Sequence, residues 1–206
     1  MHITKKGLRV LGIAESFASH EYSVLAGVVM RKDLRIDGIS FSRITVGGMD
    51  ATEGVLTLYR HLKRKDINLI LVSGCVIAWY NILDPSRIYE KTGVPVVVVT
   101  YEDSEGLKDD ISHHFPGDAA RMACYESLGE RIPCSLSTGH TLFLRSCGLD
   151  PADAGQICRD FTFDGKIPEP LRIARLMARA AMYFSAETSE TGKISNPGIN
   201  IPHDQV

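Results

Sequence analysis

The sequence predicts an α/β protein with a mixed five-stranded central sheet, in which strand two is antiparallel to the others and helices cover both faces. Two observations predict this class. Residues 8–14, 68–73 and 94–100 are short apolar runs, as expected of parallel strands that are covered on both faces. A hairpin and helical segments separate these runs, and this order of elements requires a sheet of mixed direction with helices packed on it.

The hairpin is predicted from two further strands at 22–30 and 36–46. The turn between them, Arg31-Lys32-Asp33, is short, so the two strands must be antiparallel neighbours. A helix follows over about 51–65. Its apolar face consists of Val55, Leu58, Tyr59 and Leu62.

The later elements complete the predicted order. Residues 77–81 form a loop after the fourth strand, and Asp84-Pro85 begins a short helix that ends at Gly93. The remaining elements are helices near 104–115, 118–130, 150–159 and 168–184 and a short strand pair at 132–136 and 141–145. This order of strands, hairpin and helices is that of the RNase H-like fold.

Length and charge limit the organisation and the partners. The 206 residues suit one domain over 1–186, and residues 187–206, with little to bury, are predicted to form a flexible C-terminal tail. The formal net charge is −2, so no global field attracts polyanions. Any surface that binds nucleic acid must therefore be a local basic patch.

Two further features bear on the compartment. No apolar run reaches the ~20 residues that a membrane-spanning helix needs, and the first residues contain no separate apolar region of a signal peptide. The five cysteines are odd in number and include no CxxC pair, which argues against a zinc or redox motif. A cytoplasmic protein with free thiols and no membrane partner is expected.

Several segments spread over roughly residues 8–182 form a recognisable series. They are Gly12-Ile13-Ala14-Glu15-Ser16-Phe17, Gly48-Met49-Asp50-Ala51-Thr52-Glu53-Gly54, Leu71-Val72-Ser73-Gly74, Thr92-Gly93-Val94-Pro95-Val96, Phe143-Leu144-Arg145-Ser146-Cys147-Gly148-Leu149 and Ile167-Pro168-Glu169-Pro170-Leu171-Arg172-Ile173-Ala174. In order and spacing, the series resembles endonuclease V and, more closely, its largely archaeal relatives in domain-of-unknown-function family ninety-nine. The resemblance implies an RNase H-like fold.

The resemblance also implies an altered metal site. In endonuclease V, carboxylates at the ends of strands one and four and a glutamate in the helix after the hairpin bind Mg²⁺, which activates water at a phosphodiester near a deaminated base. Carried over to this sequence, the strand positions fall on Ala14 and Ser73, and the helix glutamate falls on Glu53. A late Asp or His position falls on Arg175, which carries the opposite charge.

The candidate catalytic and metal-ligating residues are therefore Glu53, Asp50 and Glu15, with Mg²⁺ or Mn²⁺ as the cofactor of an active enzyme. Asp50 lies three residues before Glu53 on the same helical side. Glu15 follows Ala14 directly and points the other way unless the strand ends there. The alternative explanation for Asp50 and Glu53 is local, because acidic side chains favour a helix N-terminus and Asp50 or Thr52 can cap it.

A second group of side chains is suited to nucleic acid. These candidates are Arg172, Arg175, Tyr80, Asn81, Ser73 and Gly74. Arginines on one helix face can bind phosphate through two hydrogen bonds, and the aromatic pair Trp79-Tyr80 can stack on a base. The alternatives are a solvated basic face for the arginines and a packing role for the aromatic side chains.

Three functions remain open at this point. The first is a nucleic-acid-binding protein with a degenerate metal site, in which Arg175 compensates phosphate charge directly. The second is an active Mg²⁺- or Mn²⁺-dependent endonuclease that acts on deaminated DNA or RNA. The third is a protein-interaction module, for example a homo-oligomer, without nucleic-acid binding; the mildly acidic pI of about 6.4 slightly favours it.

Overall fold

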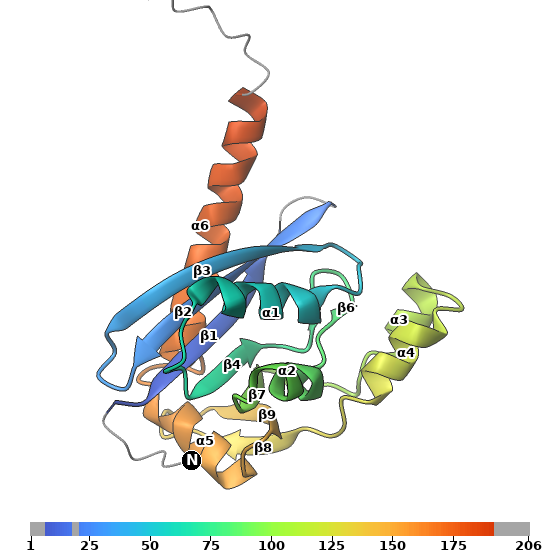
Figure 1. Cartoon of the computed structure of the whole chain (residues 1–206). Coiled ribbons are helices and arrows are strands. Elements are labelled where there is room, and N and C mark those ends of the chain that lie inside the picture. Colours follow the sequence, from blue (N-terminus) through green and yellow to red (C-terminus); the bar gives the residue numbers. More distant parts are fainter. Residues whose placement is uncertain (1–6, 18–20, 192–206) are drawn as a thin grey trace, which may run out of the picture.

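The computed structural model describes residues 7–17 and 21–191, with side chains as far as Phe184. Its centre is a seven-stranded sheet with the order β3-β2-β1-β4-β7-β9-β8 (Figure 1). The strands are β1 (Arg9–Ser16), β2 (Tyr22–Arg31), β3 (Ile36–Thr45), β4 (Leu69–Ser73), β7 (Val96–Thr100), β8 (Ile132–Ser135) and β9 (Thr141–Cys147). A separate two-stranded ribbon, β5 (Val76–Ile77) and β6 (Asn81–Ile82), follows β4.

The strand directions confirm the predicted mixed sheet. β1, β4 and β7 are parallel, whereas β2 is antiparallel to both of its neighbours, β1 and β3. The prediction of five strands is too low, because the strand pair predicted at 132–136 and 141–145 joins the same sheet through antiparallel pairing of β9 with β7. The sequence of a hairpin does not show which other strand it will pair with. Here β9 of the hairpin pairs with β7 and so adds two strands to the sheet.

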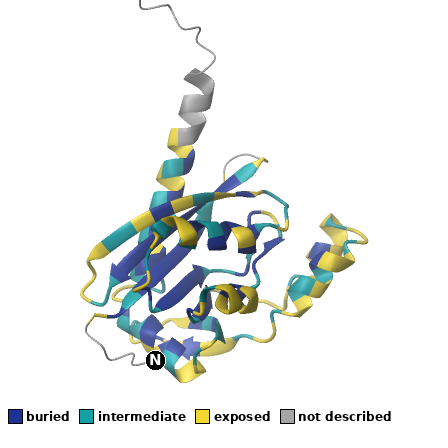
Figure 2. Ribbon diagram, in the orientation of Figure 1, coloured by how far each residue is buried: buried dark blue, intermediate teal, exposed yellow. Residues whose placement is uncertain are grey.

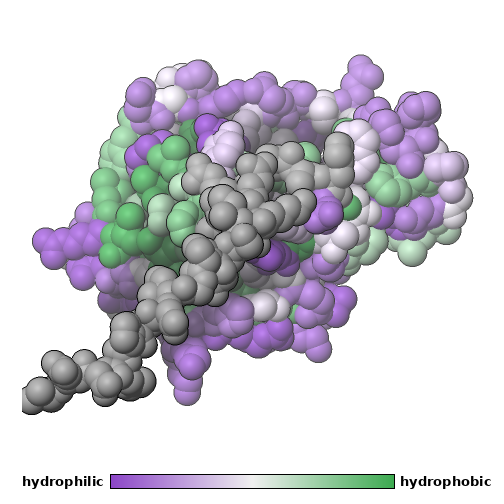
Figure 3. All heavy atoms as spheres, turned by 90° about the horizontal axis from the view of Figure 1, so that it is seen from above, coloured by the Kyte–Doolittle hydropathy of each residue, from purple (hydrophilic) through white to green (hydrophobic). Residues whose placement is uncertain are grey.

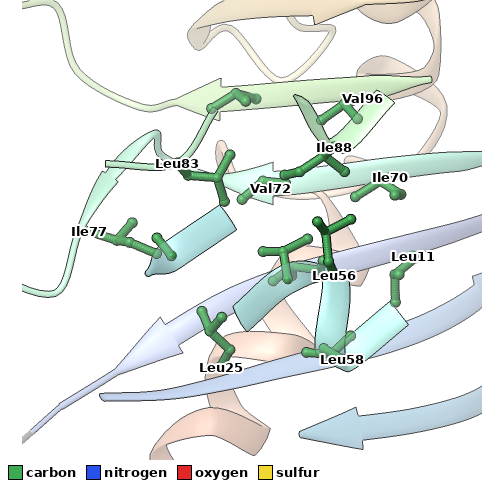
Figure 4. Close-up of a cluster of buried hydrophobic side chains, with 14 of the residues drawn as sticks. Leu11, Leu25, Leu56, Leu58, Ile70, Val72, Ile77, Leu83, Ile88 and Val96 are labelled. Atoms are coloured by element: carbon green, nitrogen blue, oxygen red, sulfur yellow. The ribbon is translucent and has the colours of Figure 1, made fainter. Parts of the chain in front are cut away.

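Helices cover both faces of the sheet, as predicted. They are α1 (Ala51–Leu62), α2 (Pro85–Thr92), α3 (Lys108–His114), α4 (Ala119–Glu126), α5 (Pro151–Asp160) and α6 (Glu169–Thr191). On one face, Leu56 of α1 and Ile88 of α2 pack with Val72 of β4 (Figure 4). On the other face, Ile157 of α5 and Leu171 of α6 enter a second apolar cluster. The central strands between these layers are buried (Figure 2).

The boundaries of α2 follow from local chemistry. The Asp84 side chain accepts hydrogen bonds from the backbone N–H groups of Ser86 at 2.9 Å and Arg87 at 3.1 Å, and Pro85 occupies the first helical position. The helix ends at Gly93, whose φ of 67° is in the left-handed region that favours glycine. These ends are those that the sequence predicts.

The last helix is longer than predicted. It continues past Phe184 to Thr191 and so includes residues 187–191, which the sequence analysis assigned to a flexible tail. The segment contains no glycine or proline before Gly192, so nothing in it ends the helix. The rest of the predicted tail, 192–206, lies outside the described residues.

Within the residues that the structure describes, no helix combines the length and apolar character that crossing a bilayer requires. The five cysteines, Cys75, Cys124, Cys134, Cys147 and Cys158, are free thiols, as the absence of paired spacing predicts.

Candidate functional site

The carboxyl ends of the parallel strands β1, β4 and β7 meet at one edge of the sheet, which is where α/β proteins commonly place their ligands. A pocket of about 240 Å³ lies there. Its lining consists of Glu15, Ser73, Gly74, Val76, Ile77, Val99, Thr100, Tyr101 and Arg175. The structure thus brings together four of the predicted site residues, namely Glu15, Ser73, Gly74 and Arg175. We call this cavity the strand-end pocket.

Ala14 is not part of the lining of the strand-end pocket. It is buried in a small apolar cluster with Val28 of β2 and Ala174 of α6. Helix α6 can approach β1 this closely because Gly12 has no side chain: a Cβ atom there would lie 2.4 Å from the carbonyl carbon of Pro170. The position that the resemblance assigns to a carboxylate is therefore part of the packing between a strand and a helix.

Ser73 ends β4 with its hydroxyl directed to a tyrosine. Its Oγ donates a hydrogen bond to Oη of Tyr101 at 3.3 Å. Burial raises the pKa of Tyr101, so that side chain is neutral at physiological pH. Gly74 follows with φ at 85° and donates its N–H to the carbonyl of Val99 in β7. Tyr101 is a site residue that sequence reasoning missed, although it directly follows the predicted strand 94–100.

Arg175 supplies positive charge to the strand-end pocket. Its guanidinium carbon lies 5.4 Å from the centre of the Tyr101 ring, an arrangement that favours a cation. In the described part of the chain, no carboxylate lies within ion-pair distance of Arg175. Arg172 differs, because two of its nitrogens are paired with the Glu169 carboxylate at 2.8 and 2.7 Å. Of the two predicted phosphate contacts, Arg175 alone lines the pocket.

Glu15 reaches the pocket but is also held by its neighbours. One carboxylate oxygen accepts a hydrogen bond from Oγ of Ser23 at 2.5 Å, and the other faces the backbone N–H of Ala78 at 3.4 Å. Glu15 is thus the one predicted acidic residue whose position agrees with the strand-end site, and it connects β1 to β2 and to the β5–β6 turn.

The other two predicted acidic residues lie elsewhere. Glu53 is exposed on α1 and pairs with Arg87 of α2 at 2.6 Å, beside a different cavity of about 410 Å³. Asp50 accepts hydrogen bonds from the N–H and hydroxyl of Thr45 and, at 2.6 Å, from the side-chain amide of Asn81. The structure does not bring Glu53, Asp50 and Glu15 together. Among the residues described, no group of three or more His, Cys, Asp or Glu is arranged to hold a metal ion.

The start of α1 is capped by a residue from another element. Asp50 occupies the N-cap position, but its side chain makes no capping hydrogen bond; Oδ1 of Asn81 accepts the hydrogen bond of the Ala51 N–H at 2.9 Å instead. Asn81 is completely buried, and its amide also donates to the carbonyl of Thr45. The prediction that Asn81 contacts nucleic acid therefore needs correction, because its polar atoms are used inside the protein.

These side chains can be compared with what Mg²⁺ or Mn²⁺ needs. Such ions prefer several anionic oxygen ligands in octahedral geometry. The strand-end pocket offers one carboxylate, from Glu15, and a hydroxyl from Ser73, and it contains the cation Arg175. Ala14 contributes no ligand atom. The residues present do not fit a two-metal site.

A second cavity adjoins the strand-end pocket. It has a volume of about 130 Å³ and shares Gly74, Val76 and Thr100 with the first. Arg131 and Arg145 are part of its lining. Nε of Arg145 donates to the carbonyl of Gly129, whereas Arg131 donates to the carbonyls of Glu102 and Ser104 and pairs with Asp103. Sequence reasoning did not select these two arginines, although Arg145 lies in one of the segments that carry the resemblance.

Tyr80 lies in the β5–β6 turn itself. Its ring is half-buried and packs with Trp79, His114 and Phe115.

Part of the surface of the molecule is apolar (Figure 3), and its exposed side chains include Ile39, Phe41 and Phe184. The predicted homo-oligomer stays a prediction.

The sheet order, the antiparallel second strand and the site at the ends of β1, β4 and β7 define an RNase H-like α/β protein. Within that class, the chain belongs to the family described as Endonuclease dU, whose family model matches residues 6–182. This confirms the family resemblance seen in the sequence. A UPF0215 protein from Pyrobaculum calidifontis is 36% identical over 184 residues, which cover 87% of this chain and 100% of the relative. A UPF0215 protein from Thermococcus kodakarensis is 34% identical and covers 86% and 94% of the two chains.

Solved structures give the same fold. The crystal structure of a protein of unknown function from Archaeoglobus fulgidus has a TM-score of 0.73 and 26% identity and covers 85% of this chain and 99% of that chain. Human ENDOV has a TM-score of 0.61 at 17% identity and covers 87% and 86%. Endonuclease V from Ciona intestinalis, in complex with DNA containing an inosine, has a TM-score of 0.59 at 15% identity and covers 87% and 88%.

Proposed function

We propose that this protein binds nucleic acid at the strand-end pocket and that it does so without a metal centre. The observation that carries the proposal is the position of Arg175, a cation with no carboxylate partner among the described residues, at the carboxyl ends of β1, β4 and β7. An anionic group is the ligand that suits this guanidinium. A phosphodiester meets that requirement, because guanidinium binds phosphate oxygens through two parallel hydrogen bonds.

The surroundings of Arg175 support a phosphate that is part of a chain. The adjoining cavity adds Arg131 and Arg145, so that basic side chains follow the strand ends over two connected pockets. Ser73 and Tyr101 add neutral hydroxyl groups to the same surface. A row of basic groups on a protein of net charge −2 is a local patch of the kind that nucleic-acid binding requires.

The comparisons support the same class of ligand. The matching family is described as an endonuclease family, and the Ciona intestinalis neighbour was solved with inosine-containing DNA. At 15% identity, that neighbour shares the fold, and its ligand comes to this chain as a proposal. DNA and RNA, with or without a deaminated base, are therefore the ligands to test.

The decisive experiment measures binding and cleavage in the same samples. Fluorescence anisotropy with labelled DNA and RNA, with and without inosine or uracil, should show binding that weakens steeply with salt. Arg175→Ala should weaken binding to every sequence and lower the salt slope by about one. Arg179→Ala is the matched control, since Arg179 is an exposed arginine of the same helix that does not line the pocket.

Cleavage assays with Mn²⁺ or EDTA separate the remaining functions. We expect no metal-dependent product. Metal-dependent cleavage that disappears in Glu53→Ala and Glu15→Ala would overturn the proposal in favour of an active endonuclease built around those carboxylates. A stable oligomer that binds none of the oligonucleotides would instead support the interaction module.

A further inference from the structure

The turn between β5 and β6 has an unusual backbone. Three consecutive residues without glycine, Ala78, Trp79 and Tyr80, have positive φ angles of 41°, 60° and 58°. Residues with a side chain rarely adopt this region, and three in a row require support from the surrounding structure. The turn therefore has a fixed shape that its own sequence does not favour.

One side of this support comes from Arg121 of α4. Its side chain is only 4% exposed, and its Nη1 donates to the carbonyls of Gly48, at 3.0 Å, and Tyr80. Nη2 donates to the carbonyl of Gly47 at 2.8 Å. The guanidinium also lies 3.8 Å from the ring centre of Phe115. Arg121 thus connects the β5–β6 turn to the loop that precedes α1.

Two further contacts support the turn, one from the loop that precedes α1 and one from β1. The N–H of Gly47 donates to the carbonyl of Ala78 at 2.8 Å, and the N–H of Ala78 faces the Glu15 carboxylate at 3.4 Å. Because Glu15 lines the strand-end pocket, the turn is attached to the proposed binding site. Val76 and Ile77, directly before the turn, line the same pocket.

The result of this support is an exposed aromatic surface. Trp79 is 49% exposed, although a side chain of this size usually gains most from burial. Its ring centre lies 5.5 Å from that of Tyr80 and 5.0 Å from that of His114. A supported, half-exposed indole two residues after Ile77, which lines the pocket of Arg175, is suited to a flat ligand that carries negative charge.

We propose that Trp79 stacks on an unpaired nucleobase of a strand whose phosphates contact Arg175, and that Arg121 is the positioning residue of this platform. The inference rests on the proposed function and adds the class of substrate, a single-stranded or locally unpaired segment. Every base has a π face, so stacking of this kind tolerates different sequences. A nucleobase is favoured over an apolar protein partner because the neighbouring pockets contain Arg175, Arg131 and Arg145, which match a polyanion.

Trp79 is the only tryptophan of the chain, so its emission reports on the platform directly. The full chain is titrated with a single-stranded oligonucleotide and with an abasic oligonucleotide of equal length, which has the phosphates without the bases. The first should quench Trp79 emission, and the second should bind without quenching it. Anisotropy of labelled strands gives both affinities.

Variants separate stacking from phosphate binding. Trp79→Ala should weaken binding of the base-containing strand roughly 5- to 150-fold, the range expected for one base stack, and leave the abasic strand unaffected. Arg175→Ala should weaken binding of both strands alike. Arg121→Met should abolish the quenching by the base-containing strand, and Arg121→Lys should restore part of it, with circular dichroism as the check on folding.

The outcomes distinguish this inference from the function on which it rests. Binding of both strands with unchanged Trp79 emission, and with Trp79→Ala equal to the wild type, would overturn the stacking inference and leave the proposed function standing. Absence of binding by either strand would overturn both. A change of emission with protein concentration alone would show that a second copy covers Trp79, which would also overturn the inference.

Discussion

Ala14 on β1 and Ala174 on α6 are buried in the same apolar cluster, at the position where the family resemblance implies a metal-binding carboxylate. Ala14→Asp should therefore destabilise the protein rather than restore a ligand. A buried carboxylate without a partner should lower the free energy of unfolding by about 2 kcal/mol or more. Urea denaturation measures this change.

Ala180→Asp is the control, because Ala180 is exposed on α6 and the same substitution there should change stability by less than about 0.5 kcal/mol. Equal stability of Ala14→Asp and Ala180→Asp would mean that the Ala14 site opens to solvent, contrary to the packing described here.

The donor set of the strand-end pocket predicts that divalent metals do not stabilise the fold. A metal ion that bound the native state would, at 100 times its dissociation constant, raise the free energy of unfolding by about 2.7 kcal/mol. Thermal unfolding in Mg²⁺, Mn²⁺ and EDTA should give the same midpoint. A higher midpoint in Mn²⁺ that disappears in Glu15→Gln would contradict the prediction and identify Glu15 as a ligand.

The chemistry of Arg175 predicts a difference between two substitutions. Arg175→Lys retains the charge but loses the planar group that makes two parallel hydrogen bonds, so affinity for nucleic acid should fall while the salt slope is kept. Arg175→Ala should lose affinity and also about one unit of slope. Anisotropy titrations over a range of salt concentrations test both. Identical slopes for the two variants would argue against a phosphate contact.

Tyr101 predicts how stability responds to alkaline pH. Burial raises the pKa of Tyr101 in the folded protein above the value of about 10 that a tyrosine has when unfolded. The stabilising contribution is thus complete below pH ~10, and it is lost as pH rises from there through the folded pKa, because only the unfolded chain releases the proton readily. Tyr101→Phe should therefore show a shallower loss of stability above pH ~10. Urea midpoints across this range provide the measurement, and parallel curves for the two proteins would contradict the assignment.

The contact between Asn81 and Asp50 predicts an electrostatic effect in the interior. Asn81→Asp would place two carboxylates where the amide now donates to Asp50 at 2.6 Å, and it should lower stability at neutral pH by about 2 kcal/mol or more. Adding Asp50→Asn should recover part of the loss, as a double-mutant cycle would measure. Unchanged stability of Asn81→Asp would mean that the Asn81 amide does not donate to Asp50.

Sequence reasoning identified those parts of the site that depend on strand ends. Glu15, Ser73 and Gly74 converge because β1 and β4 are parallel neighbours, which the apolar runs predict. Residues whose role depends on long-range packing were harder to interpret. Asn81 follows an aromatic pair in a predicted loop, but tertiary structure turns its amide inward to cap α1.

Arg121 could not be recognised from the sequence for a related reason. It is an arginine on a short helix, for which a solvated position is the usual expectation. Its burial depends on carbonyl groups from two loops that lie more than 40 residues earlier in the chain. No local pattern records such a contact, and the same is true of the pairing of β9 with β7.

The close approach of α6 to β1 at Gly12 determines where the positive charge of the strand-end pocket lies. Because a Cβ atom at this position would meet the backbone of Pro170, the depth at which α6 rests on β1 depends on a residue that has no side chain. Arg175 is carried by the same helix, slightly more than one turn beyond Pro170. Any larger residue at position 12 would lift the helix and displace the guanidinium from the strand ends. The charge that the pocket offers to a ligand is thus set by the fit between two backbones.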